Sequence, residues 1–193
     1  GQPRVGAVLR LPGRVRHGAP VHRIPGPGRQ RGRPVASLPR RIVLTGSEST
    51  GKTTLAAALA ARLGTIWVPE YAREYLEKNG TSYQYEDLEK IAAGQLTLEE
   101  KYLDDVKNHP TYKDNHLLFI DTDMYVMKVW CEYVFGKCHP FILDQIVERK
   151  YDLYLLCNTD LPWVKDQLRE YPDLQTRQEL YLMYKDIVLN QPV

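Results

Sequence analysis

The stretch RIVLTGSESTGKTTLAAALAARLG, residues 41–64, decides the fold. Its aliphatic run at 42–44 predicts a buried strand, and its alanine- and leucine-rich part at 53–63 predicts a helix that ends at Gly64. Eight residues in the order Gly-x4-Gly-Lys-Thr join the two: Gly46, Ser47, Glu48, Ser49, Thr50, Gly51, Lys52 and Thr53. This is the pattern of a phosphate-binding loop, and it requires a strand before it and a helix after it, as here.

A loop of this kind predicts binding of a nucleoside triphosphate. Its glycines let successive backbone N–H groups point at phosphate oxygens, and the N-terminus of the following helix adds a positive dipole end. Lys52 is expected to reach the β- and γ-phosphates, and the Thr53 hydroxyl to ligate Mg²⁺. We therefore expect ATP and Mg²⁺ as cofactors, with the loop residues and Thr54 against the nucleotide. A glycine-rich turn with a solvated lysine is the alternative, but the pattern arises by chance in only about one chain in a hundred.

Beyond residue 64 the chain alternates between apolar strands and amphipathic helices. Further strands are predicted at 65–68, 117–120 and 153–157. Helices are predicted at 72–78, 86–107, around 126–134, and at 140–149, 163–169 and 174–189. Continuous apolar strands that alternate with helices predict an α/β fold, a three-layer P-loop NTPase sandwich with a parallel sheet covered on both faces.

Acidic residues follow two of the predicted strands, at the edge where parallel sheets bind ligands. Asp121 stands where P-loop proteins place a second acidic residue for Mg²⁺. The alternative is a helix cap, which Asp123 could also provide. Glu70 ends the second strand, where a carboxylate can accept a proton from a substrate hydroxyl. A kinase needs such a base and a plain ATPase does not; a helix-start charge is the alternative.

Two arginines flank the segment EYPDLQT between the last two predicted helices. Arg169 and Arg177 are expected to belong to a mobile lid that brings guanidinium groups onto the transferred phosphate. Solvated helix charges are the alternative.

Several spaced motifs together resemble one known family. They are GSESTGKTTLA, VPEYAREYL, AAGQ, FIDTD, FGKCHPF and PWVKDQLREYPDLQTRQE, and the match runs from about Arg41 to the end of the chain. These motifs resemble the ribosylnicotinamide kinase domain of the NadR family. The resemblance implies a nucleoside kinase-like sheet with strand order 2-3-1-4-5. It also implies transfer of the ATP γ-phosphate to the 5′-hydroxyl of nicotinamide riboside, which gives nicotinamide mononucleotide for NAD salvage.

The resemblance also assigns residues by position. Lys52, Glu70, Arg169 and Arg177 become catalytic, with Glu70 as general base and the arginines as phosphate clamps. Thr53 and Asp121 become the metal ligands. The residues expected at the substrate, besides Glu70, are Tyr71, Arg73, Asp123 and Trp163. A kinase for another nucleoside, or an ATP-binding regulatory P-loop protein that hydrolyses ATP slowly, are the other functions considered.

The resemblance has two departures. The family also carries an adenylyltransferase domain before the kinase, sometimes with a DNA-binding helix-turn-helix, and neither fits in 41 residues. It continues with a fifth strand and a helix where this sequence stops at Val193. We therefore expect a kinase domain at 41–193 that lacks its last strand.

The charges of the chain are segregated. Residues 1–41 hold ten Arg, seven Gly, seven Pro and no Lys, Asp or Glu. Subtracting these ten from the 26 basic residues leaves 16 against 24 acidic residues beyond residue 41, a net charge of −8. We expect residues 1–40 to be disordered, either as a basic arm or as a leader foreign to the native protein. The acidic remainder disfavours sequence-independent nucleic-acid binding, and a small-molecule nucleoside is the expected partner.

The cysteine content and the hydropathy of the sequence indicate the cellular compartment to expect for the protein. Three cysteines without a Cys-x-x-Cys pair are typical of a reduced, cytoplasmic protein. The alternative is that two of these cysteines, Cys131 and Cys138, bind a metal together with His139. No apolar stretch is long enough to predict a membrane span.

Overall fold

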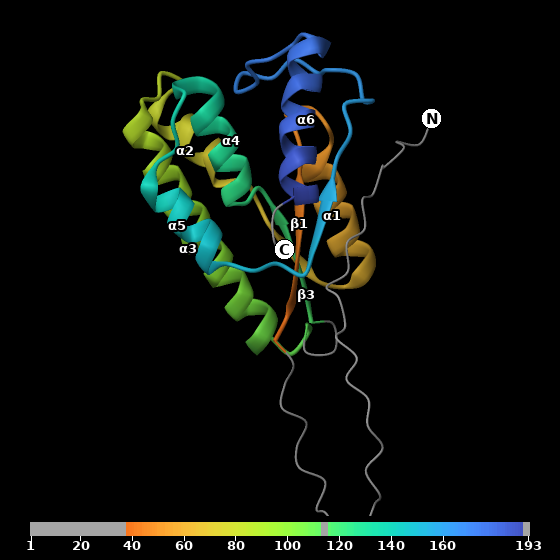
Figure 1. The fold of residues 1–193 in the computed structure, drawn as a ribbon. Coiled ribbons are helices and arrows are strands. Elements are labelled where there is room, and N and C mark those ends of the chain that lie inside the picture. The colour runs from red at the N-terminus through yellow and green to blue at the C-terminus, as the bar shows by residue number, and fades with distance from the viewer. Residues whose placement is uncertain (1–37, 113–115, 191–193) are drawn as a thin grey trace, which may run out of the picture.

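The computed structural model describes residues 38–112 and 116–190 (Figure 1). The disorder predicted for residues 1–40 falls almost wholly outside this range, although Arg40 already opens the first strand. In chain order the elements are β1 Arg40–Thr45, α1 Lys52–Leu63, β2 Ile66–Val68, α2 Tyr71–Asn79, α3 Tyr85–Asn108, β3 Leu117–Asp121, α4 Met124–Phe135, α5 Pro140–Glu148, β4 Leu153–Leu156 and α6 Leu174–Asn190.

The described strands form one parallel sheet in the order β2-β3-β1-β4. This confirms the predicted α/β sandwich and the first four places of the predicted strand order. In the register of the sheet, Leu44 pairs with Asp121 and Thr45 pairs with Leu156. The end of β3 therefore lies beside the start of the phosphate loop, as parallel pairing of the central strands requires.

Helices cover both faces of the sheet, because successive strand residues point to opposite sides. On one face Leu44 and Phe119 pack against Ala56 and Ala60 of α1. On the other face Val43, Ile120 and Tyr154 pack against Val106 of α3 and Val188 of α6. Figure 1 shows α2, α3, α4 and α5 together on one side of the sheet and α1 on the other.

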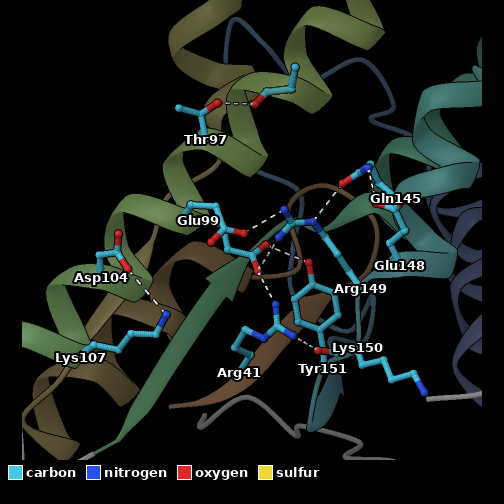
Figure 2. A network of polar contacts seen from close by, with 12 residues as sticks. Arg41, Thr97, Glu99, Asp104, Lys107, Gln145, Glu148, Arg149, Lys150 and Tyr151 are labelled. Atoms are coloured by element: carbon cyan, nitrogen blue, oxygen red, sulfur yellow. Dashed lines mark hydrogen bonds and ion pairs between the residues drawn. The ribbon is translucent and has the colours of Figure 1, made fainter. Parts of the chain in front are cut away.

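The buried carboxylate of Glu99 ties the starts of β1 and β4 to α3, away from the phosphate loop (Figure 2). Its side chain is 1% exposed, and Tyr151 donates its hydroxyl to it at 2.8 Å. Arg41 and Arg149 lie 3.2 and 3.5 Å away. Burial raises the pKa of Glu99 even though the tyrosine and the two arginines oppose this rise. The network therefore stabilises the end of the sheet where β1 and β4 begin, which is the end away from the phosphate loop.

The helix predicted at 163–169 is wrong. Residues 157–173, between β4 and α6, contain no helix. Two prolines, Pro162 and Pro172, bound a stretch too short to hold a helix alone, and Pro172 disfavours the helical region for Tyr171. Backbone N–H groups of this stretch instead donate to side chains, for example from Leu168 to Asp166 at 3.0 Å.

Candidate active site

The phosphate loop leaves β1 through a glycine that no other residue could replace without strain. Gly46 has φ +135°, and a Cβ on it would lie 2.7 Å from the carbonyl oxygen of Cys157. Gly51, with φ +80°, precedes the first turn of α1. The Thr50 hydroxyl donates to the Ser47 carbonyl at 2.7 Å and closes the loop on itself. The backbone therefore curls as the sequence pattern predicts, and Ser47 and Thr50 are buried.

Lys52, Thr53 and Asp121 meet at the base of this loop. Lys52 donates its Nζ to the Ser47 carbonyl at 2.9 Å, and Thr53 donates its hydroxyl to Asp121 Oδ2 at 2.5 Å. Asp121 is fully buried, and its Oδ1 accepts no hydrogen bond from any described residue. Burial raises the pKa of Asp121 to about 6; Lys52 opposes this rise and the nearby Glu70 adds to it.

These two oxygen-bearing side chains fit a magnesium ion. A hydroxyl and a carboxylate are the hard ligands that Mg²⁺ takes, usually only one or two from the protein, with phosphate and water oxygens for the rest. The unpartnered Oδ1 of Asp121 is an acceptor that such an ion would satisfy. No group of three or more His, Cys, Asp or Glu among residues 38–112 and 116–190 could hold a metal, including the cysteines and His139.

Glu70 follows the end of β2 and lines the same cleft as the phosphate loop. It precedes the first residue of α2 and does not cap that helix with its side chain. Its Oε1 accepts a hydrogen bond from the Thr122 hydroxyl at 3.3 Å. Thr122 has φ +81°, an uncommon conformation for a threonine that directs attention to a functional site. The carboxylate therefore faces the cleft, held by the residue that follows Asp121.

A buried glutamine that the sequence analysis gave no role holds the two acidic strand ends together. Gln95 of α3 is 1% exposed and accepts the Tyr71 N–H at 2.7 Å. It donates to the Pro69 carbonyl at 3.2 Å and to the Asp121 carbonyl at 3.5 Å. Its signal in the sequence was a polar residue on the apolar stripe of α3, at the position between Ile91 and Leu96 where a core side chain is expected.

The phosphate loop and Glu70 line one cleft with a volume of about 200 Å³, whereas Asp121, Thr122 and Gln95 are not among its lining residues. Its polar end is formed by residues 46–54, Glu70, Arg73 and Arg169. Its apolar wall comes from α4 and α6, with Val126, Trp130, Tyr133 and Tyr184. A cleft lined both by a phosphate loop and by aromatic side chains suits a ligand that is part anion and part planar ring.

Other predicted site residues lie elsewhere. The described residues that line the cleft do not include Tyr71, Asp123, Trp163 or Arg177. Tyr71 packs its ring against Gly94, where a Cβ would lie 2.0 Å from the ring. Asp123 caps α4 by accepting the Val126 N–H at 3.2 Å. The Tyr154 hydroxyl donates to the other oxygen of Asp123 at 3.1 Å. Burial raises the pKa of Asp123 to about 6.

The two predicted lid arginines differ in position. Arg169 lines the cleft and donates to the Val164 carbonyl at 2.6 Å. Arg177 is only 2% exposed and donates to the carbonyls of Ser49 and Leu161, each at 3.2 Å. Burial lowers its pKa. Arg169 lines the cleft 3.4 Å from the Ser49 hydroxyl, whereas Arg177 holds the backbone of the phosphate loop.

Comparison with known proteins places this geometry in a family. The sequence pattern of an AAA domain matches residues 41–191. The chain belongs to this AAA domain family. It is also 34% identical, over 144 residues, to the trifunctional NAD biosynthesis/regulator protein NadR of Escherichia coli strain K12, and 35% identical over 134 residues to NadR of Salmonella typhimurium strain LT2. These alignments cover 72% and 67% of this chain but 33% and 31% of the relatives, so the chain spans about a third of their length.

Solved structures share the fold. A NadR protein in complex with NR superimposes with a TM-score of 0.62 at 23% identity, covering 80% of this chain and 44% of that one. A thymidylate kinase from Ehrlichia chaffeensis gives a TM-score of 0.56 at 16% identity, covering 79% and 82%. The resemblance to NadR and the P-loop kinase-like fold, both predicted from the sequence, are confirmed. Within the described residues, no helix has both the length and the apolar character needed to cross a membrane.

Proposed function

We propose that this chain is an ATP-dependent nucleoside kinase that phosphorylates the 5′-hydroxyl of nicotinamide riboside and forms nicotinamide mononucleotide for NAD salvage. The observation that carries the proposal is that Glu70 and the phosphate loop line the same cleft. The similarity to NadR, a protein named for NAD biosynthesis and solved in complex with NR, supports the choice of substrate.

Each polar residue of the cleft has a task in this proposal. The backbone N–H groups of the loop and Lys52 hold the ATP phosphates, for which Lys52 must leave the Ser47 carbonyl. Thr53 and Asp121 would hold Mg²⁺, which neutralises charge on the phosphates when bound. Glu70 accepts the proton of the attacking hydroxyl, and the Thr122 hydroxyl orients the carboxylate.

The remaining groups orient the two substrates. Arg169, which lines the cleft 3.4 Å from the Ser49 hydroxyl, meets the transferred phosphate. Arg73 lines the cleft and contacts the nucleoside, while Arg177 acts through the Ser49 backbone. The aromatic wall with Trp130 and Tyr133 stacks on the base. Because every nucleoside carries a planar base, the wall alone does not choose among them.

A substrate panel with two variants tests the proposal. Purified protein receives ATP, Mg²⁺ and one nucleoside at a time, with nicotinamide riboside among them, and the phosphorylated product is measured. Glu70→Gln keeps the size and hydrogen bonding of the side chain but cannot take a proton, so transfer should fall about 10²- to 10⁴-fold while ATP binding persists. Glu74→Gln, one turn further along α2 and exposed, is the matched control.

The outcomes separate the functions. Faster phosphorylation of nicotinamide riboside than of any other nucleoside supports the proposal. Faster phosphorylation of a different nucleoside would make that nucleoside the substrate. If the rate of ATP hydrolysis does not change with any added nucleoside and is retained in Glu70→Gln, the chain is instead a regulatory ATPase.

A further inference from the structure

The phosphate loop carries an acidic side chain that a phosphate would repel. Glu48 lines the cleft and makes no ion pair with any residue of 38–112 or 116–190 at 4.0 Å or less. Both carboxylate oxygens are nevertheless occupied. Oε2 accepts the backbone N–H of Glu170 at 3.0 Å, and Oε1 accepts the N–H of Tyr171 at 2.5 Å. A carboxylate that accepts two amide hydrogen bonds makes strong, charge-assisted contacts.

These donors belong to the irregular segment 161–173, which we name the lid segment. The next loop residue binds it as well: Ser49 Oγ accepts the Val164 N–H at 3.1 Å. The Arg169 guanidinium lies 3.4 Å from the same hydroxyl. Glu48 and Ser49 therefore hold the lid segment at two separate points, and Arg169 lies between them in sequence. The docked segment thus presents Arg169 to the cleft.

The far side of the lid segment is held to the substrate wall. Glu170 Oε2 accepts the Tyr83 hydroxyl at 3.1 Å, and Tyr83 in turn accepts the Trp130 indole N–H at 2.9 Å. Arg73 of α2 pairs with Asp166 at 3.3 Å. Each of these contacts is a single hydrogen bond or a partly exposed ion pair, whereas Glu48 accepts two backbone N–H groups at once. The lid segment thus spans the cleft, and its strongest described attachment is on the phosphate loop.

We propose that Glu48 is a positioning residue that docks the lid segment on the phosphate loop and so places Arg169 at the transferred phosphate. In this role the carboxylate touches no reacting atom. The kinetic consequence rests on the proposed kinase function, whereas the docking itself is tested without turnover.

Hydrogen exchange measures the docking. Peptides that cover 163–173 are followed by mass spectrometry in the wild type, Glu48→Ala and Glu48→Gln, without ligand. Loss of hydrogen bonds to a charged group should speed exchange at Glu170 and Tyr171 about ten- to a hundredfold in Glu48→Ala. Glu48→Gln keeps one acceptor oxygen and should give an intermediate rate. Glu86→Gln removes the same charge from an exposed site on α3 and should leave these peptides unchanged.

Kinetics then separate docking from substrate contact. With ATP and nucleoside, Glu48→Ala should lower kcat about tenfold or more, because Arg169 is no longer held at the phosphate. A ten- to hundredfold change in exchange corresponds to about 1.4–2.7 kcal/mol, so the unfolding midpoint should fall by no more than about 10 °C and the variant should remain folded in the assay. Exchange at 163–173 that stays at the wild-type rate overturns the proposal. A higher nucleoside KM with unchanged exchange overturns it too, because the carboxylate would then serve the substrate.

Discussion

Replacing Arg149 by methionine should destabilise the protein in a way that depends on pH. Arg149 lies 3.5 Å from Glu99, which is 1% exposed. Two unit charges at this distance attract by about 5 kcal/mol at an effective dielectric constant of about 20. Arg149 is 17% exposed and also pairs with Glu100 at 2.9 Å, and Arg41 still faces Glu99. We therefore expect a net loss of about 2 kcal/mol at pH 8, below the 3–5 kcal/mol typical of a broken buried pair.

The sign of the pH dependence follows from the pKa of Glu99, which burial raises above its ordinary value. A carboxyl with a raised folded-state pKa contributes stability fully below its unfolded pKa and loses it as pH rises through the folded one. Removing Arg149 raises the folded pKa further, so the variant should lose less at pH 5 than at pH 8.

Thermal unfolding at both pH values measures this effect. For a domain of this size, 2 kcal/mol corresponds to a midpoint about 4–8 °C lower at pH 8. Glu100→Gln removes the exposed partner of Arg149 and should cost about 0.5 kcal/mol or less. Adding Glu99→Gln to the Arg149→Met variant should remove the difference between the two pH values. An equal loss at pH 5 and pH 8 would refute the reasoning, because it would trace the loss to packing instead of charge.

Smaller changes test other parts of the site. Lys52→Ala should lower phosphoryl transfer about 10²-fold or more and leave the circular dichroism spectrum unchanged; wild-type turnover would contradict the assignment of the phosphate loop. Gly46→Ala should cost more stability in urea unfolding than Gly64→Ala, because both have positive φ but only Gly46 would meet a carbonyl oxygen, at 2.7 Å. Gln95→Leu should cost about 1–3 kcal/mol, because it leaves the buried Tyr71 N–H unpaired; an unchanged urea midpoint would show that water replaces the amide.

The parts of the site that sequence predicted are those fixed by local pattern. The strand, loop and helix of residues 41–64 follow one another in the chain, and the phosphate loop depends only on backbone conformation and on Lys52 and Thr53. Asp121 could be placed beside Thr53 because the carboxyl ends of parallel strands share one edge of the sheet. The 2.5 Å contact between them is the direct result.

The parts that sequence could not place depend on packing between distant segments. Asp121 ends β3 and Asp123 stands two residues later, yet one carboxylate keeps an unpartnered oxygen at the loop while the other caps α4. The sequence left open which of the two carboxylates caps the helix, and the structure assigns that role to Asp123, which accepts hydrogen bonds from Val126 of α4 and from Tyr154 of β4, 31 residues away. Arg177 was likewise predicted as a phosphate clamp from its place beside EYPDLQT and from the family resemblance, and its bonds to the Ser49 and Leu161 carbonyls depend on folding that the sequence does not show.

The failed helix at 163–169 has a functional consequence of its own. In a helix that continued through residue 171, the N–H groups of Glu170 and Tyr171 would donate to carbonyls four residues earlier. They would then be unable to reach Glu48, which accepts both in the structure. The prolines that prevent the helix therefore leave free the donors that the phosphate loop uses. An irregular segment is weaker than a helix in its own hydrogen bonding, but here that weakness is what lets it attach to the loop and bring Arg169 to the cleft.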